Sequence, residues 1–290
     1  MAHDKKLNAP ASFALALVSL SVASISKTNF ADKLKAFINE AKEKSARLVL
    51  LPEYSIAPIL EEMEGNTVNA TAFIEKELKK LAVQYSIYIC GGTGVYLENN
   101  KLYNKSFLVN PTGTLIYQSK INLIESEKAE GFSGGQQVQI LVTPFVKMAI
   151  CVCYDIEFPE LVRQIVLQNV DLILNPSYTV DQFGSQRVQY CAQARAIENH
   201  IYIAKTCLVG NKGHMYSPCG FGKSALYSPI DHGFDVMGTV AETTANAEEI
   251  LVVEVNLPML YKLRQQSSTS PLKDYLNLNF NSLPMQLIQF

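Results

Sequence analysis

The sequence predicts an α/β fold of the α+β type, in which a mixed β-sheet, or two such sheets packed face to face, is layered with helices. Apolar runs of strand length alternate along the chain with segments of helical periodicity. Some strand-like runs follow one another with only turn residues between them, as in hairpins. The chain has 290 residues, 48% of them hydrophobic, and no low-complexity linker. We therefore predict one domain over residues 1–290, with a C-terminal tail at 276–290.

The first strand is expected in the apolar part of residues 5–26. This segment also has the charged start, apolar stretch and small residues of a secretory signal peptide. We favour a core strand, because a helical segment with Asn29 as its expected cap and a second apolar run, RLVLLPE at 47–53, follow it. The apolar face of that helix consists of Phe30, Leu34, Phe37, Ile38 and Ala41. Together they form a βαβ unit, in which the first strand is the neighbour of the second.

The remaining elements follow from periodicity and turn signals. Helices are expected at 73–85, 159–168, 185–199 and 258–266, the second with Pro159 in its first turn. Strands are expected within 87–120, where the turns ENN and NPTG separate apolar runs, and at 146–155, 170–177, 201–210, 220–229 and 248–257. After residue 266 we expect a polar, irregular end.

Charge and cysteine content narrow the classes of partner. The net charge is −2 and there is no basic run, which argues against nucleic acid or a membrane surface as a partner. The longest apolar stretch is too short to span a membrane. Six cysteines occur without framework spacing, which is typical of free thiols in a reducing compartment, so we expect a cytoplasmic protein.

The segment KMAICVCYDIEFPEL at 147–161 contains the first candidate for chemistry. In a strand, Cys151 and Cys153 would share one face, but no second Cys/His pair accompanies them to make a metal site. Cys151 lies inside an apolar run and is assigned to the core. Cys153 lies where that run stops, so we expect it at the carboxyl end of a strand, where α/β sheets build their sites.

A cysteine nucleophile needs a base and a group that stabilises the oxyanion. None of the four histidines ends an expected core strand, so a carboxylate base is favoured. Glu53 directly follows the apolar run LVLLP, and Lys120 follows another expected strand. Taken singly, each could be an ordinary solvated charge at the end of a strand.

Taken together, these residues resemble the nitrilase superfamily of carbon–nitrogen hydrolases. The resemblance rests on LLPE, SKINL and CYDIEFPE, and on DLILNPS, AQARAIENHIYIAKTCLVGN, GKSALYSP and EEILVVEVNLPMLYKLR, from about residue 13 to 275. It implies a four-layer αββα sandwich of two mixed sheets. It also implies that Glu53 is the general base, Lys120 the oxyanion stabiliser and Cys153 the nucleophile, without a metal or an organic cofactor.

The family also has a second glutamate shortly after the lysine. ESEKAEGFSGG offers Glu125, Glu127 and Glu130 for this place, and we choose Glu127. The backbone N–H of Tyr154 is the expected second oxyanion donor. Tyr54 and Tyr178 are candidates for the pocket wall, although an aromatic residue near a site is more often packing.

Supporting roles are expected for four charged residues. Arg195 and Glu198 are three positions apart on a helix and should form a structural ion pair. Asp155 and Glu160 are expected to support the turn that carries the cysteine. The chain resembles most the branch of the family that is often fused to an acetyltransferase domain, but we expect the hydrolase domain alone. It carries Glu157 where many relatives have arginine, and YTVDQF after NPS, which leaves the substrate open.

The expected activity is hydrolysis of a small amide through a cysteine thioester. The alternatives are a nitrile or N-carbamoyl hydrolase, an acyltransferase of the same fold, a non-catalytic binding protein, and a redox or metal protein that uses both cysteines. We also expect a homo-oligomer, at least a dimer, because the apolar tail has no regular period. The tail residues that a two-fold axis could bury are Leu276, Leu278, Phe280 and Leu287.

Overall fold

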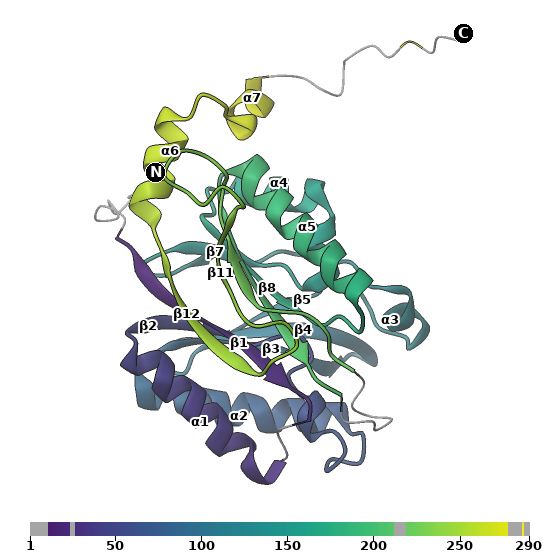
Figure 1. Cartoon of the computed structure of the whole chain (residues 1–290). Coiled ribbons are helices and arrows are strands. Elements are labelled where there is room, and N and C mark those ends of the chain that lie inside the picture. Colours follow the sequence, from purple (N-terminus) through teal and green to yellow (C-terminus); the bar gives the residue numbers. More distant parts are fainter. Residues whose placement is uncertain (1–10, 24–26, 212–218, 278–285, 287–290) are drawn as a thin grey trace, which may run out of the picture.

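The computed structural model describes residues 11–23, 27–211, 219–277 and 286. Figure 1 shows the layers: helices, two packed β-sheets and further helices on the far side. The four-layer sandwich that the resemblance implies is confirmed.

Two sheets form the middle of the molecule. One has the strand order β5-β4-β3-β2-β1-β12, and the other runs from β6 through β7, β8 and β9 to β10 and β11. They join where the end of β1 pairs with β9, Leu20 opposite Leu208. The strands are β1 Phe13–Ser21, β2 Ala46–Leu50, β3 Tyr88–Glu98, β4 Lys101–Val109, β5 Leu115–Ser119, β6 Leu141–Val142, β7 Lys147–Ile150, β8 Leu172–Ser177, β9 Tyr202–Val209, β10 Ala225–Tyr227, β11 Thr239–Glu242 and β12 Glu249–Val255.

The expected first core strand is confirmed as β1, which lies between β2 and β12. Successive side chains of a strand point to opposite faces. Leu15 and Leu17 accordingly belong to the core between the sheets, and Ala16 and Val18 to the core under the first helices. Both faces are buried, which explains why this stretch is apolar throughout.

Helices cover the outer faces of both sheets. The helices α1 and α2 cover the first sheet, and α4 and α5 cover the second (Figure 1). The helices are α1 Lys27–Glu43, α2 Thr67–Tyr85, α3 Glu125–Ala129, α4 Pro159–Val166, α5 Gln182–Asn199, α6 Leu257–Gln266 and α7 Pro271–Asn277, with 3-10 turns η1 Ala57–Ile59 and η2 Cys153–Glu157. No helix within the described ranges is long and apolar enough to cross a membrane.

The helix expected from residue 185 begins three residues earlier, at Gln182, and two other expected helix starts are wrong. Asn29 lies inside α1, which already begins at Lys27, so it is not the cap of that helix. The helix expected from residue 73 begins at Thr67 instead, because the side chain of Asn66 accepts a hydrogen bond of 2.9 Å from the backbone N–H of Asn69 and caps the helix there.

The strand expected at 146–155 is also shorter than predicted. It ends at Ile150, and the chain turns into η2 at Cys153. The alternation that would place Cys151 and Cys153 on one strand face therefore does not apply. Cys151 is 1% exposed, and its backbone N–H still donates to the carbonyl of Leu174, 2.9 Å away. Its assignment to the core is confirmed.

The chain after residue 266 is not wholly irregular, because Pro271–Asn277 forms α7. Leu276 of this helix is exposed, while Leu278, Phe280 and Leu287 lie outside the described residues. The short elements β6, β11 and α3 were not expected either. Of these, α3 matters most, because it reaches the pocket described next.

Candidate active site

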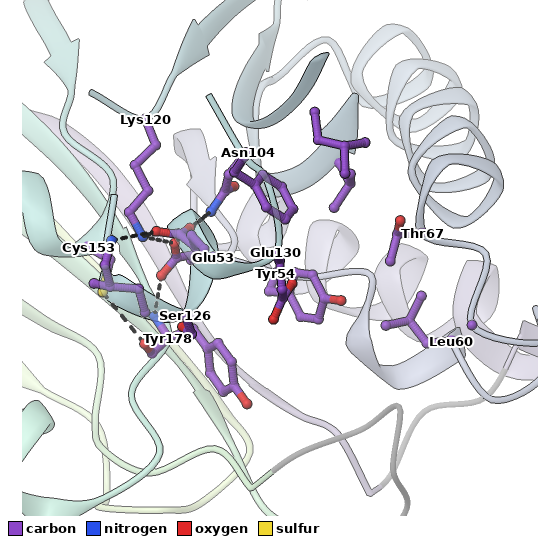
Figure 2. A pocket seen from close by; sticks show the side chains of 16 residues that line it. Glu53, Tyr54, Leu60, Thr67, Asn104, Lys120, Ser126, Glu130, Cys153 and Tyr178 are labelled. Carbon is purple, nitrogen blue, oxygen red and sulfur yellow. Dashed lines mark hydrogen bonds and ion pairs between the residues drawn. The ribbon is translucent and has the colours of Figure 1, made fainter. Parts of the chain in front are cut away.

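A pocket of about 500 Å³ opens where several strands end. The strands β2, β5, β7 and β8 run in one direction, so their carboxyl ends meet at one edge of the sandwich. Figure 2 shows the side chains that these ends contribute. The residues at the reactive end of the pocket are Glu53, Asn104, Lys120, Glu127 and Cys153.

Glu53 lies just beyond β2 and is 4% exposed. The tight turn that presents it puts Tyr54 in the left-handed region, at φ 57°. The backbone N–H of Tyr54 donates to Oγ1 of Thr93 over 2.9 Å, which ties the turn to β3. The neighbouring Gly92 has φ 72°, and a Cβ there would collide with the carbonyl oxygen of Pro52. Glycine is therefore required at this close approach of β3 to the turn.

Lys120 lies directly beyond β5 and links two carboxylates. Its Nζ donates to Oε1 of Glu53 over 2.9 Å and to Oε1 of Glu127 over 3.0 Å, and lies 2.9 Å from the second oxygen of Glu127. Burial lowers the pKa of the Lys120 ammonium, but Glu53, Cys153 and Glu127 outweigh this effect and raise the pKa well above its ordinary value. Lys120 is therefore a permanent cation.

Asn104, in the middle of β4, was missed by the sequence reasoning. Its Nδ2 donates to Oε1 of Glu53 over 3.0 Å and to Oε1 of Glu127 over 2.8 Å. Only the amide nitrogen can face two carboxylates, so the orientation of this side chain is determined. The sequence offered one signal, because asparagine is disfavoured inside strands and Asn104 falls within the expected strands of 87–120.

Cys153 is the first residue of η2, with φ 45° and 6% exposure. Its Sγ lies 3.5 Å from the carbonyl oxygen of Tyr178, to which the thiol donates. Burial raises the pKa of the thiol well above its ordinary value; Glu53 raises it further, and Lys120 lowers it in part. At neutral pH the group is a thiol that needs a base before it can act as a nucleophile.

Asp155 holds the cysteine turn against the loop that begins at Lys120. Its carboxylate accepts backbone hydrogen bonds from Val152 at 3.1 Å, Ile121 at 3.2 Å and Asn122 at 2.7 Å. Burial raises the pKa of Asp155 to about 6, although the N–H groups of Asn122 and Ile121 lower it. The expected supporting role of Asp155 thus has a structural basis.

Arg195 holds the same turn from α5. Its guanidinium donates to the carbonyl oxygens of Ile156 and Glu157 over 3.2 and 3.4 Å, and pairs with Glu198 over 3.0 Å as expected. Glu157 forms an ion pair of 2.9 Å with Arg187, which also lies on α5.

Glu160 lies exposed in the first turn of α4. The supporting role expected for it is wrong, because α4 begins at Pro159 and carries this side chain into solvent.

The structure distinguishes the three candidates for the second glutamate. Glu127 reaches Lys120, and its second oxygen accepts a hydrogen bond of 3.0 Å from the backbone N–H of Ile124 at the start of α3. Glu125 pairs with Lys128 over 2.6 Å on the surface. Glu130 is exposed and lines the outer part of the pocket.

Tyr54 and Tyr178 both line the pocket, with their rings stacked at a centroid distance of 6.0 Å and an interplanar angle of 13°. The backbone N–H of Tyr178 donates to Oε2 of Glu53 over 3.0 Å. The ring of Tyr154 is not part of the lining and packs edge-on against Phe158, with centroids 5.0 Å apart. Its backbone N–H lies in the first turn of η2, where N–H groups have no partner within the helix.

Among the described residues, the cysteines and acidic side chains form neither a disulfide nor a metal site. All six cysteines are free thiols. Within the part of the chain that the structure describes, no three His, Cys, Asp or Glu side chains are grouped so that they could hold a metal ion.

Comparison with known proteins gives consistent matches. A family model described as Carbon-nitrogen hydrolase matches residues 14–265. The chain is 32% identical over 255 residues to the Probable hydrolase YhcX of Bacillus subtilis (strain 168), covering 84% of this chain but only 50% of that protein. It is 26% identical over 273 residues to Omega-amidase NIT2 of Xenopus tropicalis, covering 88% of this chain and 93% of that protein.

Among solved structures, Nit3 of Saccharomyces cerevisiae, a member of branch 10 of the nitrilase superfamily, superimposes with a TM-score of 0.74 at 25% identity. The match covers 89% of this chain and 95% of that one.

Proposed function

This chain belongs to the carbon–nitrogen hydrolase family, and from that premise we propose that it hydrolyses a small amide through a thioester on Cys153. The observation that carries the proposal is the arrangement around Lys120. Its ammonium is bonded to the carboxylates of Glu53 and Glu127 at the end of the pocket where the Cys153 thiol lies. This end of the pocket thus has a base, a nucleophile and a fixed cation.

In the first step Glu53 takes the proton of the thiol while Sγ of Cys153 attacks the amide carbon. The backbone of Tyr178 links the two groups, because its N–H donates to Glu53 and its carbonyl accepts from the thiol. The raised pKa of Cys153 makes this proton transfer necessary. Glu53 then gives the proton to the departing nitrogen, so that ammonia or an amine leaves and the thioester remains.

The negative charge on the former carbonyl oxygen needs donors during both steps. A lysine ammonium has three N–H donors, and the two glutamates occupy two of those of Lys120. The third, with the backbone N–H of Tyr154, is assigned to the oxyanion. Such a donor typically contributes ~3–4 kcal/mol to the transition state.

In the second step water cleaves the thioester. Glu53 takes a proton from the water as its oxygen attacks the acyl carbon, the C–S bond breaks, and the thiol regains a proton. The products are a carboxylate and the free enzyme. Glu127 and Asn104 hold Glu53 and Lys120 in register in both steps and do not bind the proton that is transferred.

An amide is favoured over a nitrile by the relatives named omega-amidase. Because these relatives are 26% identical, the choice needs a direct assay. Purified protein should release ammonia and a carboxylate from short primary amides in plain buffer, faster than from the matching nitriles or N-carbamoyl amines. Mass spectrometry of the quenched reaction should find the acyl group on the peptide that contains Cys153.

Two variants control this assay. Cys153→Ala should release no ammonia, and Cys151→Ala, which removes a thiol two residues away in the core, should remain active. An active Cys153→Ala protein would contradict the proposal. Product that forms only when an amine acceptor is added would instead identify an acyltransferase.

A further inference from the structure

The lining of the pocket carries more negative than positive side chains. It contains the carboxylates of Glu53, Glu127 and Glu130 against the single ammonium of Lys120, a formal charge of −2. Lys120 is already bonded to the two glutamates at the reactive end. Within the described part of the chain no basic side chain pairs with Glu130, so its charge acts on whatever fills the outer part of the pocket.

Glu130 lies where the far end of a bound substrate would be. It ends α3 at the rim, and Figure 2 shows it beside Tyr54. Burial raises the pKa of the Tyr54 hydroxyl to about 12, and the nearby charge of Glu130 contributes to this rise. The ring of Tyr54 in turn stacks on the ring of Tyr178. The rest of the outer lining is uncharged and includes Leu60, Thr67, Val95, Leu102 and Phe132.

One feature of the outer pocket favours the opposite charge. Thr67 lines the pocket and is the first residue of α2, and a helix N-terminus carries about half a positive charge. The Asn66 side chain already accepts the N–H of Asn69, so part of that positive end is used. The full negative charge of Glu130 therefore outweighs it in this half of the pocket.

We infer that the acyl part of the substrate ends in a cation, an ammonium or guanidinium group, and that Glu130 is the residue that selects it over a carboxylate. The inference rests on the proposed amide hydrolysis and specifies its substrate class. A carboxylate accepts hydrogen bonds from such a cation, and the faces of Tyr54 and Tyr178 attract it as well. A terminal carboxylate would instead meet Glu130 with no described basic side chain to compensate.

The test uses three amides of matched length that differ only in the far end: hexanamide, 5-aminopentanamide and the monoamide of hexanedioic acid. The wild-type protein should show the highest kcat/KM with the ammonium-ended amide and the lowest with the carboxylate. Glu130→Gln should reduce the ratio between these two by about ten-fold, which corresponds to about 1.4 kcal/mol. The wild-type ratio should also shrink at high ionic strength, because the rim is open to solvent.

Glu125→Gln is the matched control. It removes the same charge from the same short helix, but Glu125 does not line the pocket and is paired with Lys128. Its ratio between the two charged amides should equal that of the wild type. Equal shifts in Glu125→Gln and Glu130→Gln would mean a diffuse field and would overturn the role of Glu130.

Binding separates this inference from the proposed catalysis. Calorimetry with the Cys153→Ala protein measures the affinities of the three amides without turnover. Tighter binding of the ammonium-ended amide supports the inference even if the wild-type protein proves to hydrolyse none of them. Tighter or equal binding of the carboxylate amide, or no binding of the ammonium-ended amide, overturns it even if small amides are hydrolysed.

Discussion

Replacing Lys120 by methionine tests the charge balance of the site most directly. The change removes the ammonium that joins Glu53 and Glu127 but keeps an unbranched side chain of similar length. Both carboxylates would still be held side by side, because Asn104 donates to Oε1 of each. A buried carboxylate and a largely buried one, held together without a cation, favour uptake of a proton by one of them.

The expected cost can be estimated from the burial of the group. Lys120 is 2% exposed, and removing one partner of a buried ion pair typically costs ~3–5 kcal/mol. At ~2.1 cal/mol/K per residue, the entropy of unfolding of the 290-residue chain is about 0.6 kcal/mol/K. The melting temperature at pH 8 should therefore fall by about 5–8 °C. Loss of the oxyanion donor should lower kcat by about 10²–10³-fold in addition.

The loss of stability should depend on pH in a defined direction. In the Lys120→Met protein one carboxyl has a folded pKa above its ordinary value of about 4.3. The folded state then binds a proton that the unfolded state releases, so stability falls as pH rises. The difference from wild type should be small near pH 5 and fully developed at pH 8. The wild-type protein should not lose stability in this way between pH 5 and pH 8, because the raised pKa of Lys120 keeps its ammonium charged throughout that range.

Scanning calorimetry at several pH values, together with the rate of ammonia release, measures both effects. The double variant Lys120→Met/Glu127→Gln removes one of the two carboxylate charges and should recover most of the stability at pH 8 without recovering activity. The reasoning is wrong if Lys120→Met melts at the wild-type temperature at pH 8. It is also wrong if the double variant is no more stable than the single one.

Four further predictions concern the nucleophile Cys153, the base Glu53, the side chain of Asn104 and the assembly of the chain. Cys153→Ala should abolish turnover with little change in melting temperature. Cys151→Ala should stay active, and its free energy of unfolding should fall by about 1 kcal/mol because a small core cavity forms. Inactivity of Cys151→Ala alone would mean that the nucleophile is misassigned. Glu53→Gln should nearly stop turnover and alkylation of the thiol by iodoacetamide, because the base is lost. In addition, all three hydrogen-bond partners of Glu53 are donors, so the NH₂ group of a Gln side chain would oppose at least one of them. A wild-type alkylation rate would argue against the role of Glu53 as base. Asn104→Ala should lower kcat by about 10–100-fold with a smaller effect on KM, since it removes one hydrogen bond from each carboxylate, and a change in KM alone would assign it to substrate binding. The protein should be a homo-oligomer, at least a dimer, that uses its tail at 276–290; light scattering that shows a stable monomer at micromolar concentration would contradict this.

Part of the site could be read from local sequence because it follows a local rule. Glu53 and Cys153 each follow an apolar run of strand length, and Lys120 directly follows another expected strand. Parallel strands place their carboxyl ends at one edge, so residues of this kind meet even when they are far apart along the chain. The recognition of β1 as a core strand also rested on local patterns, because a helical segment and a second apolar run follow it and complete a βαβ unit.

Other features were not readable from the sequence. The strand before Cys153 ends at Ile150 because Asp155 and Arg195 bind the following turn, and Arg195 comes from a distant helix. Local composition in ESEKAE does not separate Glu127 from Glu125 and Glu130, and the choice of Glu127 came from the family pattern alone. Which of the three reaches Lys120 depends on which side of α3 faces it.

The sequence by itself determined the order of the longer strands and helices, the family resemblance and the three residues at strand ends, because each depends on periodicity or on a short motif. Only the tertiary structure decided that Asn104 joins the two carboxylates and that Glu130 lies at the rim without an ion-pair partner among the described residues. The physical reason is that the charges of a site balance one another only when the charged side chains lie close together in space. Two glutamates share one ammonium only when β2, β4, β5 and α3 are brought together, and the sequence shows each charge without showing its partner.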